Sequence, residues 1–423
     1  MAVLWLEDVD ADDVGTVGGK AASLGELIGA GLPVPPGFTV TADTYRTFIE
    51  EAGIDEELFA AVDVDPEDSV ALREAEDAAA ELILETPLPE DVREEIVDRY
   101  RAMGDDGEAA FVAVRSSATA EDLPDSSFAG QQETFLNVRE QALIRRVKEC
   151  WASLFTQRAI YYRQQRGFPH AEVDIAVVVQ RMVDADKSGV MFTSHPSTGD
   201  PQITIEAAWG LGEAVVSGTV SPDNYVYDRE RATVDEVTIA DKKVEMVKDA
   251  ETGETVTMDV DDERRNSRVL SDAAIEELVA LGERVEDHYG TPQDVEWAIY
   301  DDEIYMLQSR PITTIQEDAG SGGEAGGSGR QGDADDERAG GVAGDENDDA
   351  DVLVDGLGAS PGVVSGTVRI VHKLDHLDQV QEGDVLVTEM TMPDMVPAMK
   401  RAAGIVTDEG GMTSHAAIIS REL

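Results

Sequence analysis

The sequence has a single cysteine, Cys150, in 423 residues. One thiol excludes an internal disulfide framework and any metal site built from several thiolates. It fits a reducing compartment, and we expect the cytoplasm. No run of about 18 apolar residues occurs, so no transmembrane helix is expected. The opening stretch "MAVLWLEDVDADD" has no basic region and turns acidic at once, unlike a signal peptide.

Basic residues are also scarce. The chain carries 33 Lys and Arg against 89 Asp and Glu, and its formal net charge is −56. The acids are spread along the chain, which is typical of a halophile's solvated surface; an acidic interaction surface is the alternative. A field of this sign opposes binding to nucleic acid and to anionic membranes. It also opposes a nucleotide, so any nucleotide site needs local cations and a metal such as Mg2+.

The length predicts two or three domains, and the 42% of hydrophobic residues are enough for a sizeable core. The apolar, β-branched run in "VDIAVVVQRM" predicts a central strand, and "AAFVAVRSS" predicts another buried strand. Helical spacing of apolar residues occurs in 55–104 and 271–289, and residues 140–166 are expected to form one long amphipathic helix. We therefore expect an α/β (α+β) fold, with helices and strands mixed through residues 1–315.

Residues 316–351 differ from the rest of the chain, because they contain no aromatic residue and almost nothing apolar. Gly, Ser and acids cannot bury enough surface to order a chain, so we expect a flexible linker. A second unit follows at 352–423, and it ends inside a helix that has barely begun. This unit reads as truncated, or as one product of a split reading frame. Its expected elements are strands at 363–371, 385–388 and 404–407 and a helix at 393–402.

The segment "EGGMTSHAAI" joins the last of these strands to the start of a helix. Gly410 and Gly411 permit a tight turn, and Ser414 or Thr413 suits the N-cap position. His415 then lies in the first helical turn, where unpaired N–H groups and the helix dipole favour an anion. A neutral imidazole that attacks phosphorus would leave the phosphoryl group beside those donors, so the spacing suits a phosphohistidine. Ordinary packing is the alternative role for this histidine.

Several long motifs together resemble those of the PEP-utilising enzymes, and in particular of phosphoenolpyruvate synthases. "GGMTSHAAIISREL" is similar to their phosphohistidine signature, and "GLGASPGVVSGTV" to the opening of the same swivelling domain. "VGGKAASLGELIGAGLPVPPGF" and "VRSSATAEDLPDSSFAGQQETFLNV" resemble the ATP-grasp domain, and "VEWAIYDDEIYMLQSRPIT" its closing metal-binding strands. The resemblance implies an ATP-grasp domain at 1–315, a linker at 316–351 and an incomplete swivelling phosphohistidine β/α domain at 352–423.

The resemblance also implies a reaction of the pyruvate, water dikinase type. ATP, with Mg2+, passes its β-phosphoryl group to a histidine, and AMP and phosphate are released. The swivelling domain then carries the phosphoryl group to a barrel domain that binds pyruvate and forms phosphoenolpyruvate. No barrel is present in this sequence, so the pyruvate site is expected elsewhere, for instance on a companion chain. The expected partners are these small molecules, with neither nucleic acid nor a membrane among them. A homodimer is compatible with the resemblance.

Lys20 and Arg115 are the first two predicted phosphate-binding residues. Lys20 in "GGKAAS" does not belong to a P-loop, because the first required glycine is replaced by Val14 and Ala21 stands where Ser or Thr is needed. The family motif implies a phosphate contact for Lys20. Arg115 ends the run "FVAVR" and is predicted to point from a sheet edge into a cleft, where its fork geometry suits phosphate. A surface salt bridge is the alternative for Arg115.

The loop "SSFAGQQET" supplies weaker candidates. Its backbone N–H groups, together with Gln131, Gln132 and Thr134, are suited to cover phosphates. Gln180 follows the apolar strand 175–179, and a polar residue at the mouth of a buried strand is placed to meet an adenine edge. Polar loops usually face water, so none of these predictions stands without the resemblance.

The hairpin "DVEWAIYDDEIYMLQSRPI" permits a geometric prediction. If Asp301–Glu303 form a three-residue loop, Glu296 pairs with Gln308, and Arg310 lies on the same face. A two-residue loop would place the two on opposite faces. In the first register one carboxylate and one amide oxygen converge to hold Mg2+, with Arg310 on the phosphates. The family's use of this Glu/Gln pair favours that register.

Three alternatives to a synthase remain. Pyruvate phosphate dikinase typically carries an extra helical insertion, for which this chain has little room. A rifampicin-type antibiotic phosphotransferase places an acceptor domain between its two units, whereas residues 316–351 are too few for a core. A non-catalytic phosphocarrier, or a remnant of a split gene, is the alternative of another class.

Overall fold

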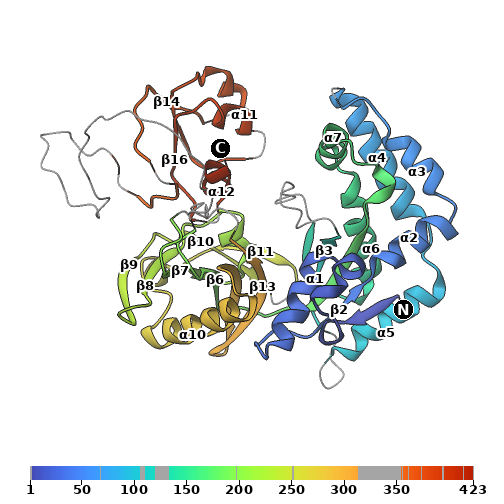
Figure 1. The fold of residues 1–423 in the computed structure, drawn as a ribbon, viewed down its shortest axis with the longest axis horizontal. Coiled ribbons are helices and arrows are strands. Elements are labelled where there is room, and N and C mark those ends of the chain that lie inside the picture. The colour runs from blue at the N-terminus through green and yellow to red at the C-terminus, as the bar shows by residue number, and fades with distance from the viewer. Residues whose placement is uncertain are drawn as a thin grey trace, which may run out of the picture.

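The structure of the protein is a computed structural model. Its described residues form three bodies, visible in Figure 1 as a helix-rich lobe, a lobe built on the second sheet, and a small unit above that lobe. Among these residues, no helix combines the length and the apolar character that crossing a bilayer requires. The described residues are 2–66, 68–104, 110–119, 133–196, 198–249, 252–312, 354, 356–360, 362–372, 374–392, 395–412 and 414–422.

The first lobe is built on a five-stranded antiparallel sheet of order β1-β2-β5-β3-β4. The predicted central strand is confirmed: β5 is the middle strand, and its residues 175–180 are all buried. Both of its faces are covered, which is why the run is continuously apolar. The strands are β1 (Val3–Trp5), β2 (Gly37–Val40), β3 (Val112–Ala118), β4 (Thr134–Val138) and β5 (Ile175–Arg181).

Helices cover both faces of this sheet. α1 (Val14–Gly29) packs on the face that includes Val178, and the others build the main core around Trp151 on the opposite face. The predicted single helix over 140–166 is wrong, because a 3-10 turn at Ser153–Phe155 and a new N-cap at Thr156 divide it in two. The remaining helices are α2 (Ala42–Glu51), α3 (Asp55–Val62), α4 (Ser69–Glu85), α5 (Glu90–Ala102), α6 (Glu140–Ala152) and α7 (Gln157–Arg166).

The second lobe carries a six-stranded antiparallel sheet of order β13-β12-β6-β7-β8-β9. α10 (Asp272–Tyr289) packs its apolar side on one face, and α8 (Glu213–Val216) lies on the other, which also carries polar side chains. A separate hairpin, β10 with β11, joins this sheet by a bridge from Met246 to Gly210. The bounds are β6 (Lys187–Phe192), β7 (Gln202–Trp209), β8 (Asp223–Asp228), β9 (Thr233–Thr238), β10 (Val244–Lys248), β11 (Thr255–Asp259), α9 (Asp262–Arg265), β12 (Gln293–Tyr300) and β13 (Glu303–Pro311).

In its described residues the third unit is a three-stranded parallel sheet of order β14-β15-β16 with two short α-helices and a 3-10 helix at Leu374–Gln379. A small core around Leu386 and Met399 holds it together. The strand predicted at 363–371 is shorter than expected. The predicted linker lies outside the described residues. The elements are β14 (Val368–Ile370), β15 (Val385–Thr388), α11 (Val396–Met399), β16 (Gly404–Thr407) and α12 (His415–Glu422). The mixed α/β class predicted from the sequence is confirmed.

Candidate functional site

Arg115 connects the two large sheets. Its guanidinium donates to the Gln308 side-chain oxygen at 2.7 Å, to the Leu307 carbonyl at 3.1 Å and to the Glu296 carboxylate at 3.3 Å. Its side chain is only 12% exposed, and its Nε has no hydrogen-bond partner among the described residues. The prediction that Arg115 ends its strand is wrong, because β3 continues to Ala118. Arg115 reaches the β12–β13 hairpin because it lies on the sheet face that is turned toward the second lobe.

The β12–β13 hairpin pairs Glu296 with Gln308, as predicted, although the predicted loop is wrong. Tyr300 pairs with Glu303, so the loop has two residues, Asp301 and Asp302, both with positive φ. A β-bulge between Glu296 and Trp297 restores the register, since the partners shift there from Met306 to Gln308. Bulges of this kind re-aim side chains. Here the bulge brings one carboxylate and one amide oxygen to the same face.

Arg310 lies on that face as well, as predicted. It pairs across the strands with Asp294, and its Nε donates to the Asp294 carboxylate at 2.8 Å. The Asp294 side chain was not predicted as part of the site. Burial raises the pKa of Asp294, and the neighbouring Arg310 opposes the shift. Asp294 therefore holds Arg310 in place at the mouth of the hairpin, beside Glu296 and Gln308.

Glu213, at the start of α8, is a second acidic residue that the sequence reasoning missed. Its pKa is raised by burial and then by the negative charge of Glu296, while Arg115 opposes the shift. Two carboxylates therefore share one neighbourhood with Arg115. A Gly-rich turn before Glu213, in "WGLGE", was the only local signal for it. Carboxylates this close repel each other unless a cation lies between them.

Lys20 is placed by a kink in α1. Gly18 has φ +75°, and a Cβ there would overlap the backbone of Ser117 on β3. The Ser117 hydroxyl donates to the Val17 carbonyl at 2.9 Å and accepts from the Ala21 N–H at 3.2 Å. The positive φ and the close approach to Ser117 both require glycine at position 18. The kink fixes the helical turn that carries Lys20 over β3, where Ser117 is two residues from Arg115.

The remaining predicted contacts divide into described and undescribed residues. Gln180 is buried on the same sheet face as Arg115, and Thr134 pairs directly with Arg115 across β3 and β4. Gln131 and Gln132 lie outside the described residues. The structure thus brings Thr134 and Gln180 to the sheet face that carries Arg115.

His415 begins α12, and its ring is fixed at one nitrogen. Ser414 is the N-cap, since its hydroxyl accepts from the Ala417 N–H at 3.4 Å. The Thr391 hydroxyl lies 2.8 Å from Nδ1 of His415, whereas Nε2 is buried without a partner among the described residues. Burial lowers the pKa of His415, and the positive charge of Arg158 lowers it further. The ring is therefore a neutral imidazole near pH 7, and Nε2 is its available nucleophilic atom when Nδ1–H donates to Thr391.

α8 separates His415 from the Arg115 cluster. Glu213 at the start of α8 interacts electrostatically with Glu296 and Arg115. After the end of α8, a Cβ at Gly218 would lie 3.4 Å from Cβ of Ser414, the residue before His415. The rise of a helix is about 1.5 Å per residue, so the two places lie roughly one short helix apart. His415 and the Arg115 cluster therefore lie near opposite ends of α8, on the same side of the second lobe.

Residues 14–324 match the family described as "Pyruvate phosphate dikinase, AMP/ATP-binding domain". The chain belongs to this AMP/ATP-binding domain family. In addition, residues 380–423 match "PEP-utilising enzyme, mobile domain". The first match contains the Arg115 cluster and the second contains His415, so the resemblance inferred from the sequence motifs is confirmed.

Curated relatives of this AMP/ATP-binding domain chain are named phosphoenolpyruvate synthase. A probable phosphoenolpyruvate synthase of Archaeoglobus fulgidus is 53% identical, over 100% of this chain and 54% of the relative. One from Methanothermobacter thermautotrophicus is 50% identical over 100% of this chain and 58% of its own length. The phosphoenolpyruvate synthase of Pyrococcus furiosus is 44% identical, over 100% of this chain and 54% of its length. The chain spans about half the length of the curated relatives it matches.

The donor set of this family member suits Mg2+. Among the described residues, no group of three or more His, Cys, Asp or Glu side chains is placed to hold a metal. Mg2+ does not need such a cage, because it is usually bound by one or two carboxylates together with substrate phosphates and water. Glu296 and the Gln308 oxygen, with Glu213 nearby, provide hard oxygen ligands of that kind.

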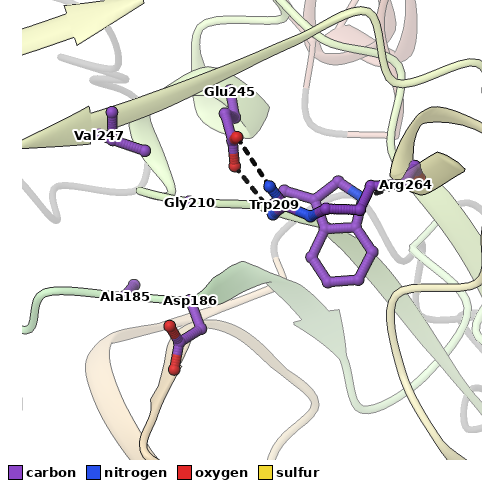
Figure 2. Close-up of a pocket in the computed structure, with 7 residues that line it drawn as sticks. All are labelled: Ala185, Asp186, Trp209, Gly210, Glu245, Val247 and Arg264. Atoms are coloured by element: carbon purple, nitrogen blue, oxygen red, sulfur yellow. Dashed lines mark hydrogen bonds and ion pairs between the residues drawn. The ribbon is translucent and has the colours of Figure 1, made fainter. Parts of the chain in front are cut away.

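A cavity of about 410 Å3 lies elsewhere in the second lobe and contains none of the predicted site residues (Figure 2). In it Arg264 forms two hydrogen bonds to Glu245, at 2.9 and 3.0 Å, and lies over the Trp209 ring. The charges of Arg264 and Glu245 are largely satisfied by each other, so the cavity offers little to an anionic ligand. The candidate site of this AMP/ATP-binding family member is the Arg115 cluster together with His415.

Proposed function

We propose that this chain carries the ATP-dependent half-reaction of a phosphoenolpyruvate synthase. Residues 1–315 act as an ATP-grasp domain, 316–351 as a flexible linker and 352–423 as part of the swivelling phosphohistidine domain. The complete reaction makes phosphoenolpyruvate from pyruvate, ATP and water, with the pyruvate site on another segment or a companion chain. The observation that carries the proposal is a neutral His415 beside the lobe that bears the Arg115 cluster, with its Nε2 lacking a hydrogen-bond partner in the part of the chain that the structure describes.

In the proposed reaction, Nε2 of His415 attacks the β-phosphorus of ATP. The bond from that phosphorus to the bridging oxygen of AMP breaks, and AMP leaves with the electron pair, so the histidine first carries both the β- and the γ-phosphoryl group. Water then hydrolyses the bond between these two groups, which releases phosphate and leaves the β-phosphoryl group on His415. The proton on Nδ1 stays on the ring, where the hydroxyl of Thr391 accepts its hydrogen bond. This hydrogen bond orients the ring, so Thr391 acts as a positioning residue.

Three cations would neutralise the phosphates. Arg115 lies on the face of the first sheet that contacts the β12–β13 hairpin, Arg310 lies on that hairpin, and Lys20 lies on the turn of α1 above β3. Such preorganised charges stabilise the negative charge that develops during phosphoryl transfer. Glu296 and Gln308 would hold Mg2+, which supplies further neutralisation of the phosphates when bound. Thr134 and Gln180, with Gln131 and Gln132, are proposed as contacts to the rest of the nucleotide.

The test is labelling with ATP that carries 32P at the β position. We expect acid-labile, alkali-stable label on the chain with Mg2+, and none in a His415→Asn variant. A His376→Asn variant serves as the matched control, since this histidine is exposed in the third unit. Absence of label in the parent chain would favour a non-catalytic phosphocarrier or remnant instead.

Isotope exchange separates the synthase from pyruvate phosphate dikinase. We expect exchange of labelled AMP into ATP without added phosphate. An absolute requirement for phosphate would favour the dikinase. Transfer of label to rifampicin in place of pyruvate, tested with the complete protein, would favour the antibiotic phosphotransferase.

A further inference from the structure

Glu206 is a fully buried carboxylate in the second lobe that the proposed reaction does not use. It lies on β7, and its exposed fraction is 0%. Its Oε1 accepts a hydrogen bond from the backbone N–H of Met412 at 2.5 Å. A Cβ at Gly411 would overlap this carboxylate, so glycine is required for the close approach. Burying a carboxylate is costly unless it is hydrogen-bonded, and one hydrogen-bond donor to Glu206 comes from the third unit.

The neighbouring contacts between the two bodies involve the same short segment, residues 409–412, which we term the docking loop. Glu409 forms an ion pair with Lys243 and accepts from the Ser221 hydroxyl at 3.1 Å. The Met412 side chain is 2% exposed and packs into an apolar cluster of the second lobe that includes Val190. The docking loop therefore combines one apolar anchor with two carboxylate contacts, and it ends three residues before His415.

Glu206 lies on the approach to α12, because the Met412 N–H that it accepts from is two residues before the N-cap, Ser414. The start of a helix attracts negative charge, because its first N–H groups lack partners and the dipole is positive there. The segment that leads into α12 meets a carboxylate of another lobe. The oxygens of a phosphoryl group on His415 would also need hydrogen-bond donors in this region.

The docked arrangement leaves little space for that group, because Nε2 of His415 is buried. The cavity beside His415 measures about 10 Å3, and its lining includes Gly218, Ser414 and Glu409. This is at most the space of one water molecule. A phosphohistidine also carries a charge of about −1.5 to −2 if it ionises like other phosphorylated side chains, and Glu409 lies on the same cavity. Both volume and charge therefore oppose docking after phosphorylation.

We propose that Glu206 and the docking loop form a latch that is selective for the unphosphorylated histidine. Glu206 holds the backbone ahead of α12 while His415 is free, and a phosphoryl group on His415 expels the docking loop. The inference rests on the proposed function for the source of the phosphoryl group. It adds a positioning residue, Glu206, and a cause for the release of the third unit from the second lobe once His415 is phosphorylated.

An engineered disulfide measures the docked state. The 3.4 Å separation of the Gly218 and Ser414 Cβ positions suits a disulfide between Gly218→Cys and Ser414→Cys. The native thiol, Cys150, is buried and does not compete. The rate of cross-linking under mild oxidation then reports the docked fraction, and the strain of a cysteine at position 218 is common to all samples.

Glu206→Gln, in this background, keeps the shape and removes the charge. We expect cross-linking without ATP to slow about tenfold or more, since a charge-assisted hydrogen bond is lost. Lys243→Gln, on the exposed side of the latch, should slow it severalfold and provides a second test that does not disturb the core. Glu236→Gln, an exposed carboxylate on β9, is the matched control. Rates within twofold of the parent in both latch variants would overturn the proposal.

Phosphorylation provides the second arm. His415 is loaded with ATP and Mg2+, or chemically with phosphoramidate, and we expect cross-linking to slow about tenfold or more in either case. Unchanged cross-linking in protein shown to carry phosphohistidine would overturn the latch and leave the proposed function intact. If ATP adds no label but phosphoramidate slows cross-linking, the latch is supported and the proposed function fails. A His415→Asn variant should respond to neither reagent.

Discussion

The guanidinium of Arg115, on β3 of the first sheet, lies 3.3 Å from the carboxylate of Glu296, on β12 of the second. The same guanidinium contacts the Gln308 oxygen at 2.7 Å. Arg115 therefore occupies the two oxygen ligands that we assign to Mg2+. Nucleotide phosphates would draw Arg115 away and free these oxygens, so nucleotide and metal are expected to bind cooperatively.

The first prediction concerns metal binding without nucleotide. Arg115→Met should increase the affinity for Mn2+, used as a Mg2+ probe, about tenfold, because a competing cation is removed from Glu296 and Gln308. The same variant should lose at least 100-fold in the rate of histidine labelling. Titration calorimetry measures the affinity, and Arg93→Met, a surface change on α5, is the control. An unchanged Mn2+ affinity would refute the competition.

The second prediction concerns the pH dependence of Glu213. Burial and the charge of Glu296 raise the pKa of Glu213, so the folded state favours its protonated form. Its contribution to stability is therefore lost as pH rises from the ordinary glutamate range through the raised pKa. Glu213→Gln should raise the melting temperature of the nucleotide-free protein at pH 7 and leave it unchanged at pH 3.5.

Thermal scans at both pH values check this, with Glu276→Gln on the exposed side of α10 as the control. Histidine labelling should fall at least tenfold in Glu213→Gln, because a negative charge near the proposed metal ligands Glu296 and Gln308 is lost. If Glu213→Gln melted at a lower temperature than the parent protein at pH 7, this would contradict the raised pKa of Glu213.

The third prediction concerns the pH profile of labelling. Burial and Arg158 lower the pKa of His415, so the neutral nucleophile persists below the ordinary histidine range. The labelling rate should stay level down to about pH 6.5 and decline only below it. Arg158→Gln should move the midpoint of this decline to higher pH, whatever it does to the maximum rate. Arg73→Gln on α4 should not move the midpoint, and a midpoint shared by all three proteins would count against the role of Arg158.

The fourth prediction concerns the hairpin turn. Asp301 and Asp302 have φ of 51° and 62°, a conformation that costs a non-glycine residue about 1 kcal/mol. Asp302→Gly should raise the melting temperature by about 2–4 °C. Asp302→Ala removes the same charge but keeps the Cβ, so it should bring no such gain. Equal shifts in the two variants would show that charge, rather than backbone conformation, limits the turn.

The sequence by itself determined the elements that depend on local pattern. The apolar run of β5, the paired strands around Asp301 and Asp302, and the Ser414 cap before His415 follow from periodicity and turn chemistry, and the structure has all three. The long motifs determined the family in the same way, because their residues and order are read directly from the chain.

Only the tertiary structure decided which distant residues share a site. The pairing of Glu296 with Gln308 depends on a bulge that compensates a shorter loop, and no local pattern encodes that shift. Glu213, Asp294, Thr391 and Glu206 gained their roles from strands and loops that pack together from separate parts of the chain. Such contacts depend on burial and on the charge of neighbours, and these quantities exist only once the sheets have folded and met.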